Sequence, residues 1–189
     1  MFPNLAFAAV YLGILVVVLG LAAYVDWTTL KVPKRLTVGL LGAGLVMNLV
    51  RGAWLGAEGR PGWLFDGGIV AGAFDGLLFA VVGFLLGFTL FFGFWIFGLG
   101  GGGDVKLVGA AGAWLGWQGV LIAVGLSLPF LVVVTVLVSG YRMSQGKLPQ
   151  TALQGSNRKR AVTTYSLPFA LGVYSVIAIG LSKALTTAG

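Results

Sequence analysis

The sequence predicts an all-α membrane protein, a bundle of about six transmembrane helices formed by one domain, residues 1–189. Of the 189 residues, 58% are hydrophobic and 9% are charged, whereas a soluble domain has about 25% charged residues. The mean hydropathy is +1.01. The 32 glycines agree with this class, because glycine is frequent in membrane helices and lets their backbones approach closely.

Six apolar runs account for the predicted helices, since about 20 mainly apolar residues cross a bilayer. They lie near residues 4–25, 36–55, 67–97, 104–117, 119–140 and 162–186. The first run is too long for the apolar part of a signal peptide and follows no basic segment, so we expect a retained helix. The third is long enough to tilt or break. The fourth is short and glycine-rich, which favours a start inside the membrane.

Basic residues predict the orientation of the bundle. Two loops, after the first and fifth runs, carry most of them: Lys31, Lys34, Arg35, Arg142, Lys147, Arg158, Lys159 and Arg160. With six spans these loops share one side with Lys106, and basic loops are retained in the cytoplasm. The termini are therefore expected to be external, together with Arg51, Arg60 and Lys183. Asp26 and Asp104 then both lie at the cytoplasmic face of the inner membrane.

The residues that are absent limit the chemistry. The chain has no cysteine and no histidine, which excludes thiolate and imidazole metal ligands and nucleophiles that depend on histidine. We therefore expect no metal site, and catalysis by carboxylates, amines or hydroxyls. The net charge of +7 is explained by the basic loops, so we expect a lipid bilayer as partner and no nucleic acid.

Three of the five acidic residues have little claim to a catalytic role. Glu58 and Asp66 lie in a polar stretch and are expected to face water. Asp75 lies deep in the third run, where an ionisable side chain usually points into the bundle. We expect it to be neutral and hydrogen-bonded to a neighbouring helix, in preference to a part in substrate handling.

Asp104 follows four glycines, 100–103, within an apolar region. Such a run favours an irregular backbone, which at membrane depth must be buried in protein or line a wet cavity, and it lets a substrate strand approach closely. The Walker pattern of a phosphate loop is absent. Asp26 ends the first run and, taken alone, is typical of an interfacial charge.

Two carboxylates at one face suffice for peptide hydrolysis. One, ionised, takes a proton from water, and the other, protonated, polarises the scissile carbonyl. Asp104 opens a helix, whose dipole favours a carboxylate, whereas Asp26 lies near a helix C-terminus, which disfavours one. We therefore expect Asp104 to act as the base and Asp26 as the protonated partner.

Several segments resemble the type IV prepilin peptidases, GxGD aspartyl proteases, and in particular their short branch that serves Tad/Flp-type pili. Gly101, Gly103 and Asp104 stand at the GxGD positions, and GGGDVKLVGAAGAWLG continues the pattern through Lys106. DWTTLKVPKRLT, with Asp26 and Pro33, resembles the segment after the first catalytic aspartate. The resemblance implies cleavage of a basic leader from prepilin or pseudopilin precursors. It also implies that Gly101, Gly103, Lys106 and Pro33 shape the site or contact substrate.

Two departures from the family are visible. Lys34 stands where asparagine is usual, and the cysteine-containing domain of the bifunctional members has no counterpart. We therefore expect a peptidase without methyltransferase activity and without a cofactor. Three alternatives remain: a small proton- or cation-coupled transporter component using Asp75, Asp26 and Asp104; a structural subunit; and a presenilin-like protease, since Tyr24-Val25-Asp26 is loosely similar to its first motif.

Overall fold

The structure, a computed structural model, describes residues 2–29, 32–65, 67–97, 101–144 and 165–188. These segments form helices α1 (Leu5–Thr29), α2 (Lys34–Ala57), α3 (Gly68–Ile96), α4 (Gly102–Ser144) and α5 (Ser166–Ala188), with no strand among them. The predicted all-α class is confirmed. The first four helices are long and apolar enough to cross a membrane, and the apolar part of α5, Ser166–Ser182, is shorter.

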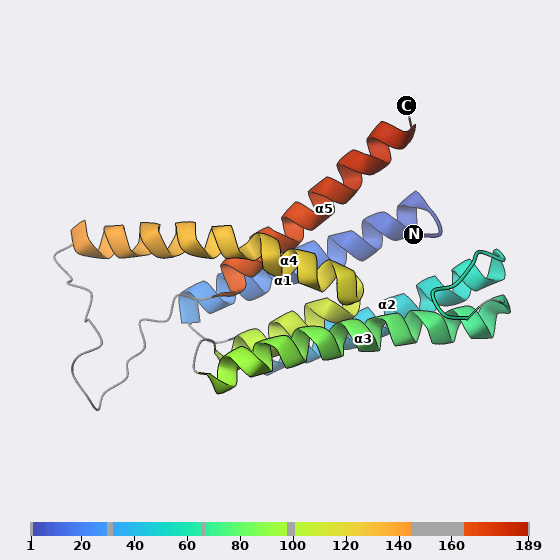
Figure 1. The fold of residues 1–189 in the computed structure, drawn as a ribbon, viewed down its shortest axis with the longest axis horizontal. Helices are drawn as coiled ribbons and strands as arrows, with labels where there is room; N and C mark the ends of the chain where they lie inside the picture. The colour runs from blue at the N-terminus through green and yellow to red at the C-terminus, as the bar shows by residue number, and fades with distance from the viewer. Residues whose placement is uncertain (1, 30–31, 66, 98–100, 145–164, 189) are drawn as a thin grey trace.

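The fourth and fifth predicted helices are the two parts of α4. Gly116 separates them, with φ of 69° and ψ of 178° inside an otherwise helical element. A positive φ favours glycine, and a Cβ at this position would also collide with the ring of Phe79. Figure 1 shows the chain turning back at this point, so that the second part of α4 runs toward the end of the bundle where the first part began.

Side chains from α1 and α2 stabilise this break. The last carbonyl groups of a helix lack intrahelical donors, and within a membrane they must find other partners. The Tyr11 hydroxyl donates a hydrogen bond to the Trp114 carbonyl at 2.5 Å, and Asn48 Nδ2 donates one to the Ala113 carbonyl at 2.8 Å. Both donors are buried. The turn at Gly116 therefore depends on two helices that are distant in sequence.

Glycines bring the helices into direct backbone contact. A Cβ at Gly52 of α2 would strike the carbonyl of Gly72 in α3, and one at Gly83 of α3 would strike the carbonyl of Gly112 in α4. Gly172 of α5 meets the Ala123 carbonyl of α4 in the same way. Small residues at these contacts are typical of membrane helix packing, which relies on close van der Waals approach.

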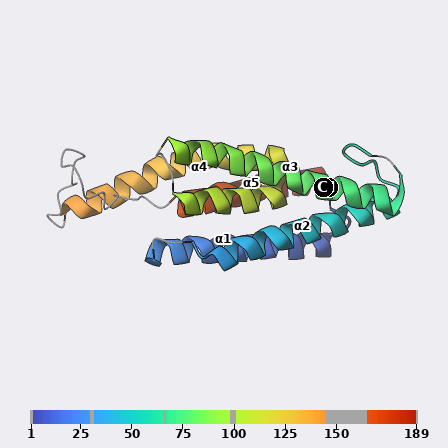
Figure 2. The ribbon, with the colours of Figure 1, turned by 90° about the horizontal axis from the view of Figure 1, so that it is seen from below.

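The bundle has two distinct ends (Figures 1 and 2). At one, which we call the aspartate end, α1 and α3 finish while α2, α4 and α5 begin. At the other, the loop end, segment 58–65 follows α2, and α1 begins. Because α3 is one unbroken helix, Asp26 and Asp104 lie at the same end, as the charge pattern predicted. The second part of α4 extends past the other helices at the aspartate end (Figure 2).

Candidate active site

Asp26 lies in the last turn of α1 and is 6% exposed. Its Oδ2 atom accepts a hydrogen bond from the hydroxyl of Ser166, which is the first residue of α5 and is fully buried. The start of α5 is thus held against the end of α1. One carboxylate oxygen of Asp26 is oriented by a hydroxyl 140 residues away in the sequence.

Asp104 lies in the first turn of α4 and is 8% exposed. Its Oδ2 atom accepts a hydrogen bond from the Gly101 N–H at 3.1 Å, and its own N–H donates to the Gly101 carbonyl at 3.1 Å. This reciprocal pairing satisfies backbone groups at the helix start, as a capping residue does. A Cβ at Gly101 would lie 3.1 Å from Asp104 Oδ2, so glycine leaves room for the carboxylate.

The structure brings Asp26 and Asp104 together at the aspartate end. Both carboxyl groups are buried, and Asp26 lies close enough to Asp104 for their charges to interact. Within the described segments, neither forms a salt bridge with a basic side chain. Each accepts one hydrogen bond from a described residue, so hydrogen bonding alone does not distinguish a protonated from an ionised member.

Tyr165, the residue before α5, lies near enough to Asp104 to interact with its charge. Its hydroxyl shares a hydrogen bond with Ser127 of α4. Its ring centroid lies 4.8 Å from that of Phe91. From the sequence we assigned no role to Ser166, Tyr165 or Ser127. Two adjacent hydroxyl residues at the start of the last apolar run, separated from Pro168 by one leucine, were the signal that could have indicated Tyr165 and Ser166.

The Val32-Pro33 segment packs against the glycine turn before Asp104. A Cβ at Gly103 would lie 3.5 Å from Val32 Cγ2, an ordinary contact distance. Pro33 is exposed and caps α2, with φ of −61° and ψ of 131°. Its carbonyl accepts a hydrogen bond from the Leu36 N–H at 3.1 Å. The segment that contains Pro33 and the glycine turn before Asp104, each of which resembles a motif of the peptidase family, are therefore neighbours in space.

Lys106 is exposed. It follows Asp104 by two residues on α4, and residues at this spacing do not share a helix face. The structure therefore does not direct Lys106 toward the buried pair.

Asp75 differs from the prediction. Its Oδ2 and Oδ1 atoms accept hydrogen bonds from the backbone N–H groups of Trp63 at 2.6 Å and Leu64 at 2.7 Å. Its partners thus lie in segment 58–65 and not in a neighbouring helix. Glu58 is exposed, as expected, and Asp66 lies outside the described residues.

Metal ligands do not gather in the described segments: no group of three His, Cys, Asp or Glu side chains comes together there. The chemically distinctive feature of the aspartate end is the pair of buried carboxyl groups. Two such groups, one ionised and one protonated, can activate water toward a carbonyl.

Comparison with known proteins identifies a family. The profile of the type IV leader peptidase family matches residues 13–139, a region that contains both aspartates. The prepilin leader peptidase/N-methyltransferase of Pectobacterium carotovorum subsp. carotovorum is 35% identical over 120 residues, covering 60% of this chain and 33% of that protein. The protein of the same name from Escherichia coli (strain K12) is 29% identical over 160 residues, covering 82% of this chain and 56% of that protein.

A third relative, the prepilin leader peptidase/N-methyltransferase of Aeromonas hydrophila, is 30% identical over 122 residues, 62% of this chain and 33% of that protein. The chain thus spans between a third and just over half of the length of these curated relatives. No solved structure matches the chain.

Proposed function

The chain belongs to the type IV leader peptidase family, and on this premise we propose that it is a membrane-embedded aspartyl endopeptidase. Its substrates are prepilin-like or pseudopilin precursors, from which it removes the basic leader. The names of the relatives support this activity. The observation that carries the proposal is that two buried carboxylates, Asp26 and Asp104, from helices α1 and α4, meet at one end of the bundle.

Asp104 is the general base of the proposed reaction and Asp26 the acid. The first turn of α4 surrounds Asp104 with the positive end of a helix dipole, whereas Asp26 lies near the negative end of α1. Asp104 removes a proton from water, whose oxygen attacks the scissile carbonyl carbon. Asp26 donates a hydrogen bond to the carbonyl oxygen. The proton held by Asp104 then passes to the leaving amine as the C–N bond breaks.

The neighbours of the pair serve as supports in this proposal. Gly101 and Gly103 keep the turn before Asp104 free of side chains, so that a substrate strand can approach closely. Pro33 fixes the start of α2 beside that turn. Lys106, exposed at the same end, contacts lipid phosphates at the membrane surface and is not a catalytic residue.

The proposed topology has six spans, with both termini external and the site at the cytoplasmic face of the inner membrane. The break at Gly116 supports it by turning α4 back on itself. The charge distribution supports it as well. Lys34, Arg35 and Lys106 lie at the aspartate end, where basic residues favour the cytoplasm.

We further propose peptidase activity alone, without a methyl donor, of the kind found in the short Tad/Flp-pilus branch. The 189 residues contain no cysteine, so the cysteine metal site of the bifunctional members has no counterpart in them. The transporter alternative is not favoured. It depended on Asp75 as part of an ion path, and both oxygens of Asp75 are bound to backbone N–H groups of segment 58–65.

Co-expression with candidate prepilin precursors tests the proposal. Wild-type protein is expected to give a shortened product whose N-terminus, read by Edman sequencing, begins after the basic leader. Asp104→Asn is expected to leave the precursor intact, and Glu58→Gln, an exposed carboxylate at the loop end, to process it normally. Equal processing by Asp104→Asn and wild type, at equal membrane levels, contradicts the proposal.

A further inference from the structure

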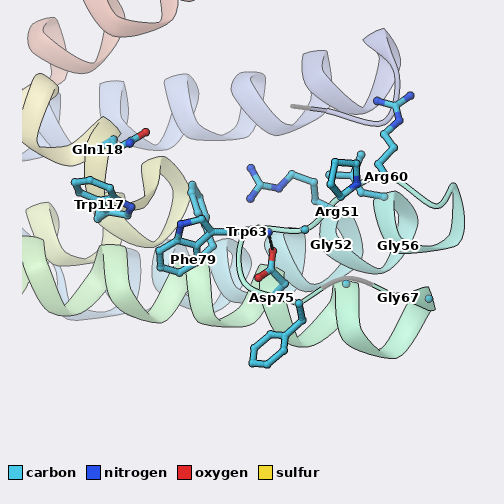
Figure 3. Close-up of a pocket in the computed structure, with 17 residues that line it drawn as sticks. Arg51, Gly52, Gly56, Arg60, Trp63, Gly67, Asp75, Phe79, Trp117 and Gln118 are labelled. Atoms are coloured by element: carbon cyan, nitrogen blue, oxygen red, sulfur yellow. Dashed lines mark hydrogen bonds between the residues drawn. The ribbon is translucent and has the colours of Figure 1, made fainter.

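A cavity of about 500 Å³ lies at the loop end, between α2, α3 and segment 58–65. Figure 3 shows the residues that line it, with Arg51 and Asp75 at its centre and Trp117 and Gln118 of α4 at one side. Its lining includes polar, charged and aromatic side chains: Arg51, Arg60, Trp63, Asp75, Phe79 and Gln118. Ligand sites commonly have volumes of roughly 300–1,000 Å³ and combine aromatic walls with a few polar groups. The peptidase proposal makes no use of this cavity.

Arg51 is the unusual residue of the cavity. Its Nε atom is buried and has no hydrogen-bond partner, and its guanidinium carbon lies 4.5 Å from the ring centroid of Phe79. No salt bridge joins it to an acidic side chain in the described segments. The Arg51 side chain as a whole is partly exposed, but a buried N–H donor without an acceptor is costly, because its hydrogen bond to water is lost and not replaced.

The other charged side chains of the cavity that the structure describes form no salt bridge with Arg51. Asp75 is near enough to act on it electrostatically, but both of its oxygens accept backbone N–H groups of segment 58–65. Arg60 is also cationic and forms a 2.9 Å salt bridge with Glu58 at the surface. In Figure 3 the Arg51 side chain reaches from α2 toward Phe79 and Trp63, while Arg60 extends away from Asp75. The lining therefore has two arginines and one acidic side chain, and the Nε donor of Arg51 is left without an acceptor.

We propose that this cavity binds a phosphate group, as carried by an anionic phospholipid head group or by free phosphate, with Arg51 as its main ligand. The forked guanidinium matches phosphate oxygens in geometry. Trp63, Leu64 and Phe65 beside the opening are 43%, 60% and 44% exposed, and aromatic residues of membrane proteins gather at head-group depth. Basic pockets between membrane helices are known to take lipid head groups.

The test titrates detergent-purified protein with three probes and follows tryptophan fluorescence, since Trp63 and Trp117 line the cavity. The probes are short-chain phosphatidylglycerol, the matching diacylglycerol without phosphate, and inorganic phosphate. Saturable binding is expected with a phosphate-bearing probe and none with diacylglycerol. Arg51→Gln is expected to weaken binding by about tenfold, the usual effect of a charge-assisted hydrogen bond. Arg35→Gln, an exposed arginine at the aspartate end, is the matched control and should bind as wild type does.

The outcomes distinguish the two possible sources of the phosphate group, a phospholipid head group and free phosphate. Binding of phosphatidylglycerol without binding of inorganic phosphate identifies a lipid head group, and equal binding of both identifies free phosphate. Two results overturn the proposal: diacylglycerol binding as well as phosphatidylglycerol, or Arg51→Gln binding as tightly as wild type. If Arg51→Gln does not fold, Arg51→Lys replaces it, with weaker binding expected because the charge is kept and the fork is lost. The site is then rejected if Arg51→Lys binds as tightly as wild type and wild type binds diacylglycerol as well as phosphatidylglycerol.

Discussion

Buried aspartates occur at both ends of the bundle, and their surroundings differ. At the loop end, Asp75 has both oxygens occupied by backbone N–H groups at 2.6 and 2.7 Å. At the aspartate end, Asp26 and Asp104 each accept one hydrogen bond from the described residues and interact with each other. All three are 6–8% exposed.

This difference teaches that burial alone does not indicate a catalytic carboxylate. Asp75 is buried where it holds segment 58–65 against α3, and both of its oxygens accept hydrogen bonds from the protein backbone. Asp26 and Asp104 each retain an oxygen atom free of described donors, and the two carboxyl groups lie near each other. Carboxylates with unused oxygens beside one another are able to act on water and substrate.

The largest expected effect is on cleavage by variants of the pair. Asp26→Asn and Asp104→Asn should each lower the rate by about 10²–10⁴-fold, the usual contribution of an acid or base. Because the two act as one unit, the double variant should be no slower than the slower single variant. The measurement is the initial rate of precursor cleavage by reconstituted wild type, the two single variants and the double variant. Multiplicative losses in the double variant would show that the carboxylates act separately.

Asp75→Asn should affect stability instead. Asparagine places an NH₂ group against one of the two backbone donors and leaves that donor unpaired, so the free energy of unfolding should fall by about 3 kcal/mol. Thermal unfolding in mild detergent measures this loss. The cleavage rate per folded molecule should stay within about twofold of wild type. If Asp75→Asn is as stable as wild type but loses as much cleavage rate as Asp104→Asn does, Asp75 takes part in catalysis and this account of it is wrong.

A smaller effect is expected at Ser166, which positions Asp26. Ser166→Ala removes one hydrogen bond to a carboxylate, worth about 1.5 kcal/mol, so cleavage should slow by about tenfold. KM should change little, because Ser166 contacts Asp26 and not the substrate in this account. Ser166→Thr keeps the hydroxyl and should restore most of the rate. Equal loss in both variants would indicate a packing defect at the buried start of α5.

The smallest effect is expected at Lys106, which is exposed beside the pair. Lys106→Gln should change the cleavage rate by less than about twofold, since a single exposed charge contributes little. Initial rates in uncharged and anionic vesicles measure it. A loss of tenfold or more in both lipids would make Lys106 a residue of the site.

The sequence predicted much of the fold because apolar length is a local signal. The predicted boundary between runs 104–117 and 119–140 falls close to the break at Gly116, and α3 is one helix, as expected. The means of stabilising the break could not be predicted. Tyr11 and Asn48 are 103 and 65 residues from the carbonyls that they bind, and nothing local in the sequence pairs them.

Some features of the candidate site could likewise be predicted from the sequence, and others could not. Counting spans and loop charges was enough to place Asp26 and Asp104 at one end, since the acidic residues are few. Ser166 could not be identified by counting, because its contact with Asp26 depends on how the start of α5 meets the end of α1. Asp75 was wrongly paired with a helix for a related reason: a hydropathy pattern does not reveal that segment 58–65 folds back over α3.

The most direct measurement is the cleavage rate per folded molecule for Asp26→Asn, Asp104→Asn and Asp75→Asn, compared in one reconstituted assay with a prepilin precursor. Circular dichroism and unfolding midpoints on the same samples give the folded fraction. The account predicts that the first two variants fold normally and do not cleave, whereas Asp75→Asn is less stable and cleaves at nearly the wild-type rate. Cleavage by well-folded Asp26→Asn or Asp104→Asn at the wild-type rate would contradict it.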